Sequence, residues 1–263
     1  GEIEKSIYIL GSPDLDLMNP KLLPTMSTVK EKYGVDFDNY AIAMFHSVTT
    51  EFEQIEEHAR KFVNALIDSK KNVTEKIILA SKSPRRKQLL KQIDFDFEVV
   101  PSQIDEDLSL DLEPNIFVEH YANLKAENVA NRYKNHWVIG ADTVVAYNKK
   151  IFGKPKDNDE SYVMLKTLSG NTHEVFTGVS IHHLNRGIIN TFHERTEVKF
   201  KTLSKECITY YIDTYGALDK AGSYGIQDWF ATCVQSINGC FYNVMGLPLA
   251  KFYEEFLSSI NTQ

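Results

Sequence analysis

Short apolar runs alternate with longer amphipathic segments from residue 76 to the end of the chain. A short run of apolar residues indicates a buried strand, and an apolar position every three or four residues indicates a helix. These patterns predict strands at 77–81, 97–100, 137–147, 173–184, 188–200, 231–237 and 240–245. They predict helices at 84–93, 114–133, 159–168, 205–214 and 248–257. Because helices alternate with strands and some neighbouring strands are joined by hairpins, we expect an α/β fold with a mixed β-sheet.

The first 75 residues carry a separate pattern, with two strand-like segments, "SIYILG" and "YAIAMF", each followed by a helical segment. The second helix is predicted to open with a capping box formed by Thr50 and Glu53. A polar stretch, "SKKNVTEK", then marks a seam. We therefore predict a partial βαβα segment at 1–75, which would bury only a marginal core by itself, and a larger domain at 76–263.

Charge and cysteine content narrow the classes of partner. The net charge is −7 and no block is rich in Lys and Arg, which argues against a nucleic-acid surface. No apolar run approaches the roughly 18 residues of a membrane span, so we expect no membrane partner. The three cysteines form no CxxC pair and fit a reduced, cytoplasmic setting. The sequence allows a homodimer without requiring one.

The segment "IILASKSPRRKQLL" places two cations where a helix favours anions. Ser83 is predicted to be the N-cap and Pro84 the first helical residue, so Arg85 and Arg86 fall in the first turn. The positive end of the helix dipole disfavours cations there. Since helix N-termini bind phosphate well, we interpret the two arginines as ligands of a polyphosphate.

Asp142 is an unusual residue for its surroundings, because it interrupts the apolar strand 137–147. An ionised carboxylate in such a strand is costly unless it is paired or binds a cation. A strand-end aspartate that caps a turn is the alternative. The neighbouring Gly140 and Ala141 favour a site, since small residues leave room for an approach to the backbone.

For three further charged residues, the local sequence alone does not distinguish a site role from an ordinary solvated side chain. Lys125 shares a helical face with apolar residues, although it could extend outward to solvent. Glu106 lies in an acidic loop and Lys154 in a predicted turn, where solvated side chains are common. Together with both arginines and Asp142, they form the mixture that polyphosphate and a divalent metal require. A metal-activated water could attack phosphorus while a carboxylate accepts its proton.

Other signatures are missing from the sequence. It contains no GxxxxGK[ST], GxGxxG or HExxH motif. His182 and His183 are adjacent on a predicted strand and should point to opposite faces, which disfavours shared metal ligation.

Six segments in order resemble the Maf family of nucleoside triphosphate pyrophosphatases over about residues 76–260. They are "ILASKSPRRKQLL", "VIGADTVV", "GKP", "LSGNTHEVFTGVSI", "LDKAGSYGIQ" and "NVMGLPL". The resemblance implies a two-lobed, ITPase-like fold with a cleft between the lobes. It also implies metal-dependent hydrolysis of a nucleoside triphosphate to the monophosphate and pyrophosphate, with Mg²⁺, Mn²⁺ or another divalent metal.

The resemblance also assigns roles by position. Asp142 would accept the proton, and Glu106 would hold the metal together with Asp142. The phosphates would be held by Ser81, Arg86, Lys125 and Lys154, with Lys125 counted among the catalytic residues.

Three further positions distinguish branches of the family: Arg85, Thr143 and Gln227 match the branch that acts on dTTP and UTP. A branch acting on 7-methyl-GTP carries an aromatic residue, a glutamine and a glutamate there. One departure is Asp228-Trp229, which follows "YGIQ" where the family usually has glycine, and which could narrow the pocket or change the nucleotide preference.

The N-terminal segment resembles part of a different family, the UDP-N-acetylglucosamine 2-epimerases. The similarity lies in "ILGSPDLDLMNP" and "YAIAMFHSVTTEF", with His46 at a motif position. A segment this short lacks most of the two lobes between which those enzymes work, so we expect no epimerase activity from it.

Three functional hypotheses follow. The first is a nucleotide pyrophosphatase that removes modified or excess pyrimidine triphosphates. The second is a non-catalytic nucleotide sensor that regulates cell division, and the third is part of a bifunctional sugar-nucleotide enzyme. Retention of Asp142, Glu106 and Lys125 favours the first, since a sensor has no need of a catalytic base and metal ligands.

Overall fold

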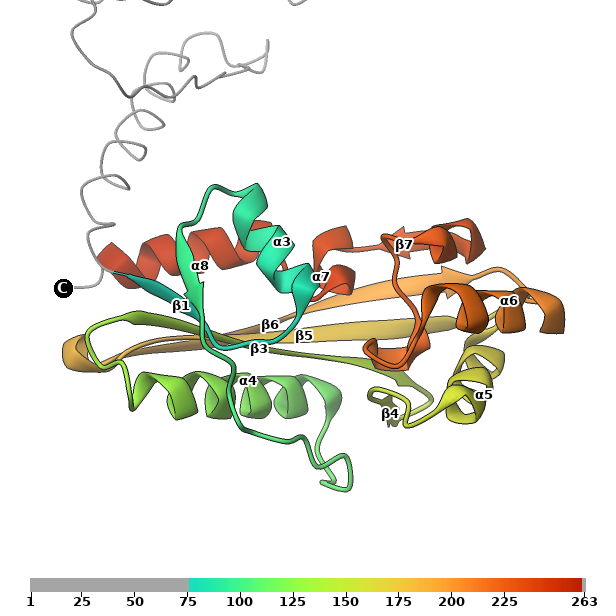
Figure 1. The fold of residues 1–263 in the computed structure, drawn as a ribbon, viewed down its shortest axis with the longest axis horizontal. Helices are drawn as coiled ribbons and strands as arrows, with labels where there is room; N and C mark the ends of the chain where they lie inside the picture. Colours follow the sequence, from blue (N-terminus) through green and yellow to red (C-terminus); the bar gives the residue numbers. More distant parts are fainter. Residues whose placement is uncertain (1–75, 262–263) are drawn as a thin grey trace, which may run out of the picture. The chain divides into compact units, whose positions relative to one another are not determined.

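The computed structural model describes residues 76–261, in which a mixed sheet carries helices on both faces (Figure 1). The seven strands have the order β2-β1-β3-β5-β6-β7, and β4 pairs with the end of β3. β1 lies parallel to β2 and β3, whereas the other pairs are antiparallel. This confirms the predicted α/β fold with a mixed sheet. The strands are β1 (Ile77–Leu79), β2 (Phe97–Val99), β3 (Trp137–Tyr147), β4 (Lys150–Phe152), β5 (Thr172–His183), β6 (Ile188–Phe200) and β7 (Val234–Asn238).

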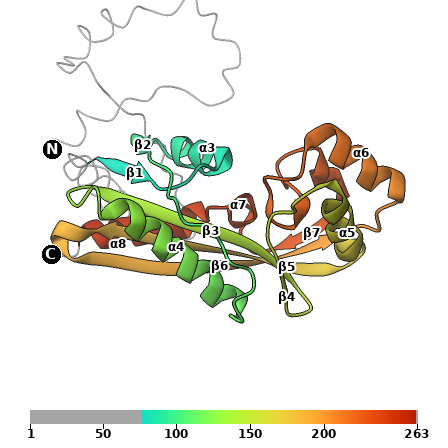
Figure 2. The same ribbon diagram turned by 60° about the horizontal axis from the view of Figure 1, so that its bottom comes forward.

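The helices fall into three groups. α4 covers one face of the long strands, and α3, α7 and α8 lie on the other face (Figure 1). α5 and α6 lie together toward one end of those strands (Figure 2). The α-helices are α3 (Pro84–Gln92), α4 (Pro114–Ala130), α5 (Asn158–Leu168), α6 (Lys205–Tyr215), α7 (Phe241–Met245) and α8 (Leu249–Asn261). The 3₁₀ helices are η4 (Leu184–Arg186), η5 (Ala221–Ser223) and η6 (Trp229–Cys233).

Strand β1 shows why a continuous apolar run folds as a strand here. Ile77 and Leu79 pack into the larger core, which includes residues of α8, whereas Ile78 packs into a smaller core beside α4. Successive side chains of a strand point to opposite faces, and a sheet covered on both faces therefore needs apolar residues at every position.

Two glycines allow α4 to approach the sheet closely. A Cβ atom on Gly140 of β3 would lie 2.3 Å from the carbonyl oxygen of Ala122, and one on Gly178 of β5 would lie 2.3 Å from that of Val118. Both carbonyls belong to the backbone of α4. The sequence predicted that Gly140 leaves room for an approach to the backbone, and the structure fills that room with a helix.

One predicted strand is wrong. Residues 240–245 were expected to be extended, but Phe241–Met245 form α7, which ends at Gly246 with a φ of 113°. An apolar run of this length does not distinguish a strand from a buried helix. The buried Asn243 side chain donates to the Val175 carbonyl and to Thr196 Oγ1, which docks the helix onto β5 and β6. The strand predicted from residue 231 also begins later, at Val234, because η6 precedes it.

Other expectations can be compared directly. His182 bonds to Asn123 of α4, whereas His183 packs edge-on against Trp137 of the larger core, so the two rings do face opposite ways. Within 76–261 no helix has the length and apolar character needed to cross a bilayer. The predicted βαβα segment and its resemblance to an epimerase lie outside the described residues.

Candidate active site

A cavity of about 400 Å³ collects every site residue predicted from the sequence. Its walls come from the start of α3, the 102–108 loop, α4, β3, the turn after β4, the 219–227 segment and the end of α7. The predicted residues that line it are Ser81, Arg85, Arg86, Glu106, Lys125, Asp142, Thr143, Lys154 and Gln227.

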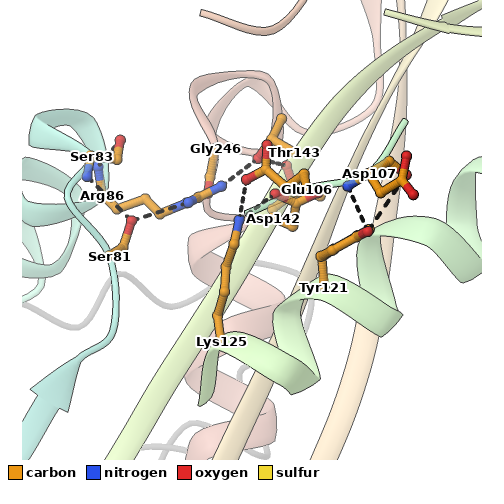
Figure 3. Close-up of polar contacts among 11 residues, drawn as sticks. Ser81, Ser83, Arg86, Glu106, Asp107, Tyr121, Lys125, Asp142, Thr143 and Gly246 are labelled. Atoms are coloured by element: carbon orange, nitrogen blue, oxygen red, sulfur yellow. Dashed lines mark hydrogen bonds and ion pairs between the residues drawn. The ribbon is translucent and has the colours of Figure 1, made fainter. Parts of the chain in front are cut away.

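A lysine and two carboxylates from α4, β3 and the 102–108 loop meet in this wall (Figure 3). Lys125 Nζ lies 2.7 Å from Asp142 Oδ1 and also donates to Glu106 Oε1. Lys125 is only 7% exposed and Asp142 3%. Lys125 therefore does not extend outward to solvent, and Asp142 lies within β3, paired with Gly178, instead of capping the end of a strand.

The pKa values of the two carboxylates are shifted in opposite directions. Burial raises the pKa of Asp142 even though the Lys125 ammonium opposes the shift. Burial also acts to raise the pKa of Glu106, but the charge and hydrogen bond of Lys125 outweigh it and hold that pKa at about 2. A pair separated in this way suits one proton acceptor and one permanent anion.

Besides the direct contact of Lys125 with Glu106, α4 also holds the loop that carries Glu106. Tyr121, one helical turn before Lys125, accepts a hydrogen bond from the Asp107 backbone N–H at 2.7 Å (Figure 3). The Asp107 carboxylate in turn accepts from the backbone N–H and the hydroxyl of Ser109. One face of α4 therefore supplies the lysine and also fixes the loop that carries Glu106.

Arg86 is buried and connects three segments of the cavity wall. Its Nε donates to the Gly246 carbonyl at 2.8 Å, and its two terminal nitrogens donate to Ser81 Oγ at 3.2 Å and Thr143 Oγ1 at 2.8 Å. Ser83 is the N-cap, as predicted, because its side chain accepts from the Arg86 backbone N–H. A guanidinium has five N–H groups, so two remain for a ligand.

The Thr143 hydroxyl belongs to a short relay of hydrogen bonds. Thr177 Oγ1 donates its only proton to the Asn243 carbonyl at 2.9 Å. Thr143, 3.0 Å away, must then donate to Thr177 while it accepts from Arg86. The relay fixes both the Thr143 rotamer and the position of the Arg86 guanidinium.

Arg85 has a carboxylate partner of its own. It donates to Asp219 Oδ2 at 2.7 Å and to the Asp219 carbonyl at 3.0 Å. Lys220 reaches the other oxygen of the same carboxylate at 3.0 Å. Burial acts to raise the pKa of Asp219, but the bonds from Arg85 and Lys220 bring it below the usual value. The two arginines at the start of α3 therefore already have acceptors within the protein, and their interpretation as ligands of a polyphosphate stays a prediction.

Lys154 and Gln227 are the most accessible of the predicted residues. Both are exposed and face the cavity, and within 76–261 neither side chain makes a hydrogen bond or ion pair. For Asp228 and Trp229 the sequence left open a narrower pocket or a changed nucleotide preference, and neither residue lines the cavity. Asp228 accepts a hydrogen bond from Tyr211 of α6, and Trp229 stacks on that ring.

Comparison with known proteins identifies the family. A family model described as "Maf-like protein" matches residues 76–258. The chain belongs to the Maf family. It is 50% identical over 179 residues to a dTTP/UTP pyrophosphatase of Thermosipho africanus, an alignment that covers 68% of this chain and 91% of that one. A dTTP/UTP pyrophosphatase of Carboxydothermus hydrogenoformans is 48% identical over 68% of this chain and 96% of its own. A solved Staphylococcus aureus Ham1 protein is a distant likeness, with a TM-score of 0.36 and 16% identity over 48% of this chain and 72% of that one.

The donor set of this Maf protein suits a divalent metal. Within the described part of the chain, no three His, Cys, Asp or Glu side chains converge on one point. Glu106 and Asp142 nevertheless offer carboxylate oxygens at the cavity, and the buried Asp142 Oδ2 has no hydrogen-bond partner in the structure. Mg²⁺ commonly binds one or two carboxylates and takes its other ligands from water and substrate phosphates. The two residues therefore fit such an ion.

Several residues that shape the site were not predicted. Asp219, Thr177, Gly246 and Tyr121 hold the predicted residues in place. Asp219, Thr177 and Gly246 lie inside segments that resemble Maf proteins, so membership of those motifs was the one available signal.

Proposed function

We propose that this protein hydrolyses nucleoside triphosphates, with dTTP and UTP preferred, to the nucleoside monophosphate and pyrophosphate. The observation that carries the proposal is the Lys125–Asp142–Glu106 cluster, with Lys125 and Asp142 buried, which faces the same cavity as Arg86 and Lys154. The names of relatives at 47–50% identity support the reaction and the nucleotide.

In this mechanism Asp142 accepts a proton from the attacking water. Its raised pKa makes it a stronger base than an exposed aspartate, which favours proton transfer near neutral pH. A P–O bond forms between the water and phosphorus as the anhydride bond between the α- and β-phosphates breaks. Lys125 stays within hydrogen-bond distance of the base and neutralises the buried charge.

The phosphates are bound by Ser81, the free N–H groups of Arg86, and Lys154. Arg86 is held by several acceptors before the substrate binds, so little side-chain entropy remains to be lost. Glu106 and Asp142 would hold a divalent metal such as Mg²⁺ or Mn²⁺. When bound, that ion supplies positive charge to the phosphate oxygens and lowers the pKa of a bound water.

Arg85, Thr143 and Gln227 are proposed to select the nucleotide. The free amide of Gln227 offers both a donor and an acceptor, which matches the imide edge of thymine or uracil. The Thr143 hydroxyl already bonds to Arg86 and Thr177, so Thr143 would contribute through the position of the Arg86 guanidinium and not through a bond to the base.

The test is to incubate the protein with each common nucleoside triphosphate and Mg²⁺ and to measure the pyrophosphate released. Turnover of dTTP and UTP above the other nucleotides is expected. Binding of a nucleotide without turnover of any would contradict the enzyme hypothesis and favour the sensor.

A further inference from the structure

The segment that carries Gln227 is anchored at both ends. The Asp228 N–H donates to the Gly225 carbonyl at 3.3 Å, which closes a four-residue turn. Ile226, inside this turn, is buried, whereas the Gln227 side chain is exposed at the cavity. The direction in which the Gln227 amide points therefore depends on what holds Gly225 and Asp228.

Both of those residues bind one buried phenol. Tyr211 Oη accepts from the Gly225 backbone N–H at 2.9 Å and donates to Asp228 Oδ2 at 3.0 Å. The other Asp228 oxygen accepts from the Phe230 N–H at 3.0 Å and caps η6. The contacts leave little free space, because a Cβ on Gly225 would lie 2.6 Å from Asp228 Oδ2.

The phenol itself is rigidly placed. Tyr211 is fully buried on α6, stacked on Tyr215 at an interplanar angle of 14° and packed edge-on against Phe230. Burial, followed by the charge of Asp228, raises the pKa of Tyr211. The hydroxyl keeps its proton at any physiological pH and remains the donor to Asp228.

We infer that Tyr211 and Asp228 are positioning residues for nucleotide selection, which hold the Gly225–Asp228 turn so that Gln227 presents its amide to the base. Neither residue lines the cavity, and both act through the turn. The inference rests on the proposed function and deepens it. Substrate recognition then depends on the hydrogen bonds of Tyr211 with Gly225 and Asp228, behind the cavity wall, as well as on the residues that face the cavity.

The inference predicts which kinetic constants should change when these hydrogen bonds are lost. Loosening the turn should weaken contacts with the base and leave contacts with the phosphates unchanged. Loss of one hydrogen bond typically corresponds to about a 2–12-fold change in affinity, and an effect that reaches the base only through the turn should lie within this range. The two contributions are separated by inorganic tripolyphosphate, which carries the phosphates and lacks a base.

The experiment compares Asp228→Asn and Tyr211→Phe with the wild-type protein. We expect KM for dTTP and UTP to rise about 2–12-fold while kcat changes less than about twofold and the inhibition constant of tripolyphosphate stays the same. Tyr211→Phe removes both hydrogen bonds of the phenol, and Asp228→Asn replaces the charged acceptor of one of them by a neutral amide. The double variant should therefore cost little more than Tyr211→Phe alone. Asp213→Asn is the matched control, an exposed aspartate on the same helix.

Two results would overturn the inference: an unchanged KM in both variants, or a parallel rise in KM and in the tripolyphosphate constant. If Tyr211→Phe fails to fold, Asp228→Asn decides the question alone. If the wild-type protein turns over no nucleotide, the proposed function fails separately. The role of Tyr211 and Asp228 is then tested by calorimetry, in which the Kd of UTP must rise in Asp228→Asn while the Kd of tripolyphosphate does not.

Discussion

The two sides of the cavity are built in different ways. On one side, Lys125 and Asp142 come from the middle of α4 and β3, and both are buried. On the other side, Arg85 lies in the first turn of α3 and Gln227 in a turn, and both can reach solvent. We call these the catalytic side and the selection side.

This difference is the one expected from the two proposed tasks, proton transfer and recognition of the base. A base gains proton affinity from burial, and a buried charge tolerates little displacement, so the catalytic side needs regular secondary structure. Base recognition uses exposed groups that exchange a protein or water partner for the ligand. Substitutions on the catalytic side should therefore reduce kcat or stability, whereas those on the selection side should change KM and nucleotide preference.

The largest effect is expected for Asp142→Asn. An amide of the same shape cannot accept the proton, and loss of a general base typically reduces kcat by about 1,000-fold. The Kd for nucleotide, measured by calorimetry, should change little because the cavity keeps its shape. Pyrophosphate release at the full rate would exclude Asp142 as the base.

Gly140→Ala should displace α4, the helix that carries Lys125, and thereby lower both stability and kcat. The new Cβ would lie 2.3 Å from a backbone oxygen of α4, which cannot move alone, so we expect about 1–3 kcal/mol of lost stability and a lower kcat. Urea unfolding and pyrophosphate release measure the two effects.

Gly187→Ala is its control. Nothing lies within 4 Å of a Cβ there, and only its φ of +67° makes the change costly, by about 1 kcal/mol. This variant should lose stability and keep its kcat. An equal loss of kcat in both variants would mean that the contact between α4 and β3 has no special role in placing Lys125.

Much of the catalytic side could be predicted from the sequence, because its key residues stand out from their own segments. Asp142 interrupts an apolar strand and Lys125 lies on an apolar helical face. The partners could not be predicted in this way. Arg85 and Asp219 are 134 positions apart, and only the folded sheet brings them together.

The secondary structure also divides into elements that local sequence signals predict and elements that depend on distant contacts. Ser83-Pro84 predicted the start of α3 and the apolar run predicted β3, since both signals are local. The helical state of 241–245 depends on contacts of Asn243 with β5 and β6, which no local pattern contains.

Glu106→Gln should change how stability depends on pH. The pKa of Glu106 is about 2 in the folded protein, against an ordinary value of 4.5. Its ion pair therefore stabilises the protein fully above about pH 4.5, and this contribution is lost as the pH falls toward 2. The raised pKa of Asp142 acts in the opposite direction, because its protonation on acidification favours the folded state.

We expect urea unfolding to show a deficit in Glu106→Gln at pH 6 that shrinks as the pH is lowered from 4.5 toward 2. Glu254→Gln, on the exposed side of α8, is the matched control and should show no such trend. A deficit in Glu106→Gln that is constant with pH would mean that the Lys125–Glu106 contact contributes no net charge stabilisation.

The smallest effect belongs to the selection side. In Asp219→Asn, Arg85 loses a carboxylate partner that competes with a bound nucleotide for its N–H groups. Asp219 is more than half exposed, and ion pairs of this kind contribute about 0.2–1 kcal/mol, so KM for dTTP should fall by no more than about fivefold. Because no group of the catalytic side moves, kcat should stay the same in steady-state assays. A fall in kcat as large as that of Gly140→Ala would show that the two sides are coupled, and the distinction between them would then fail.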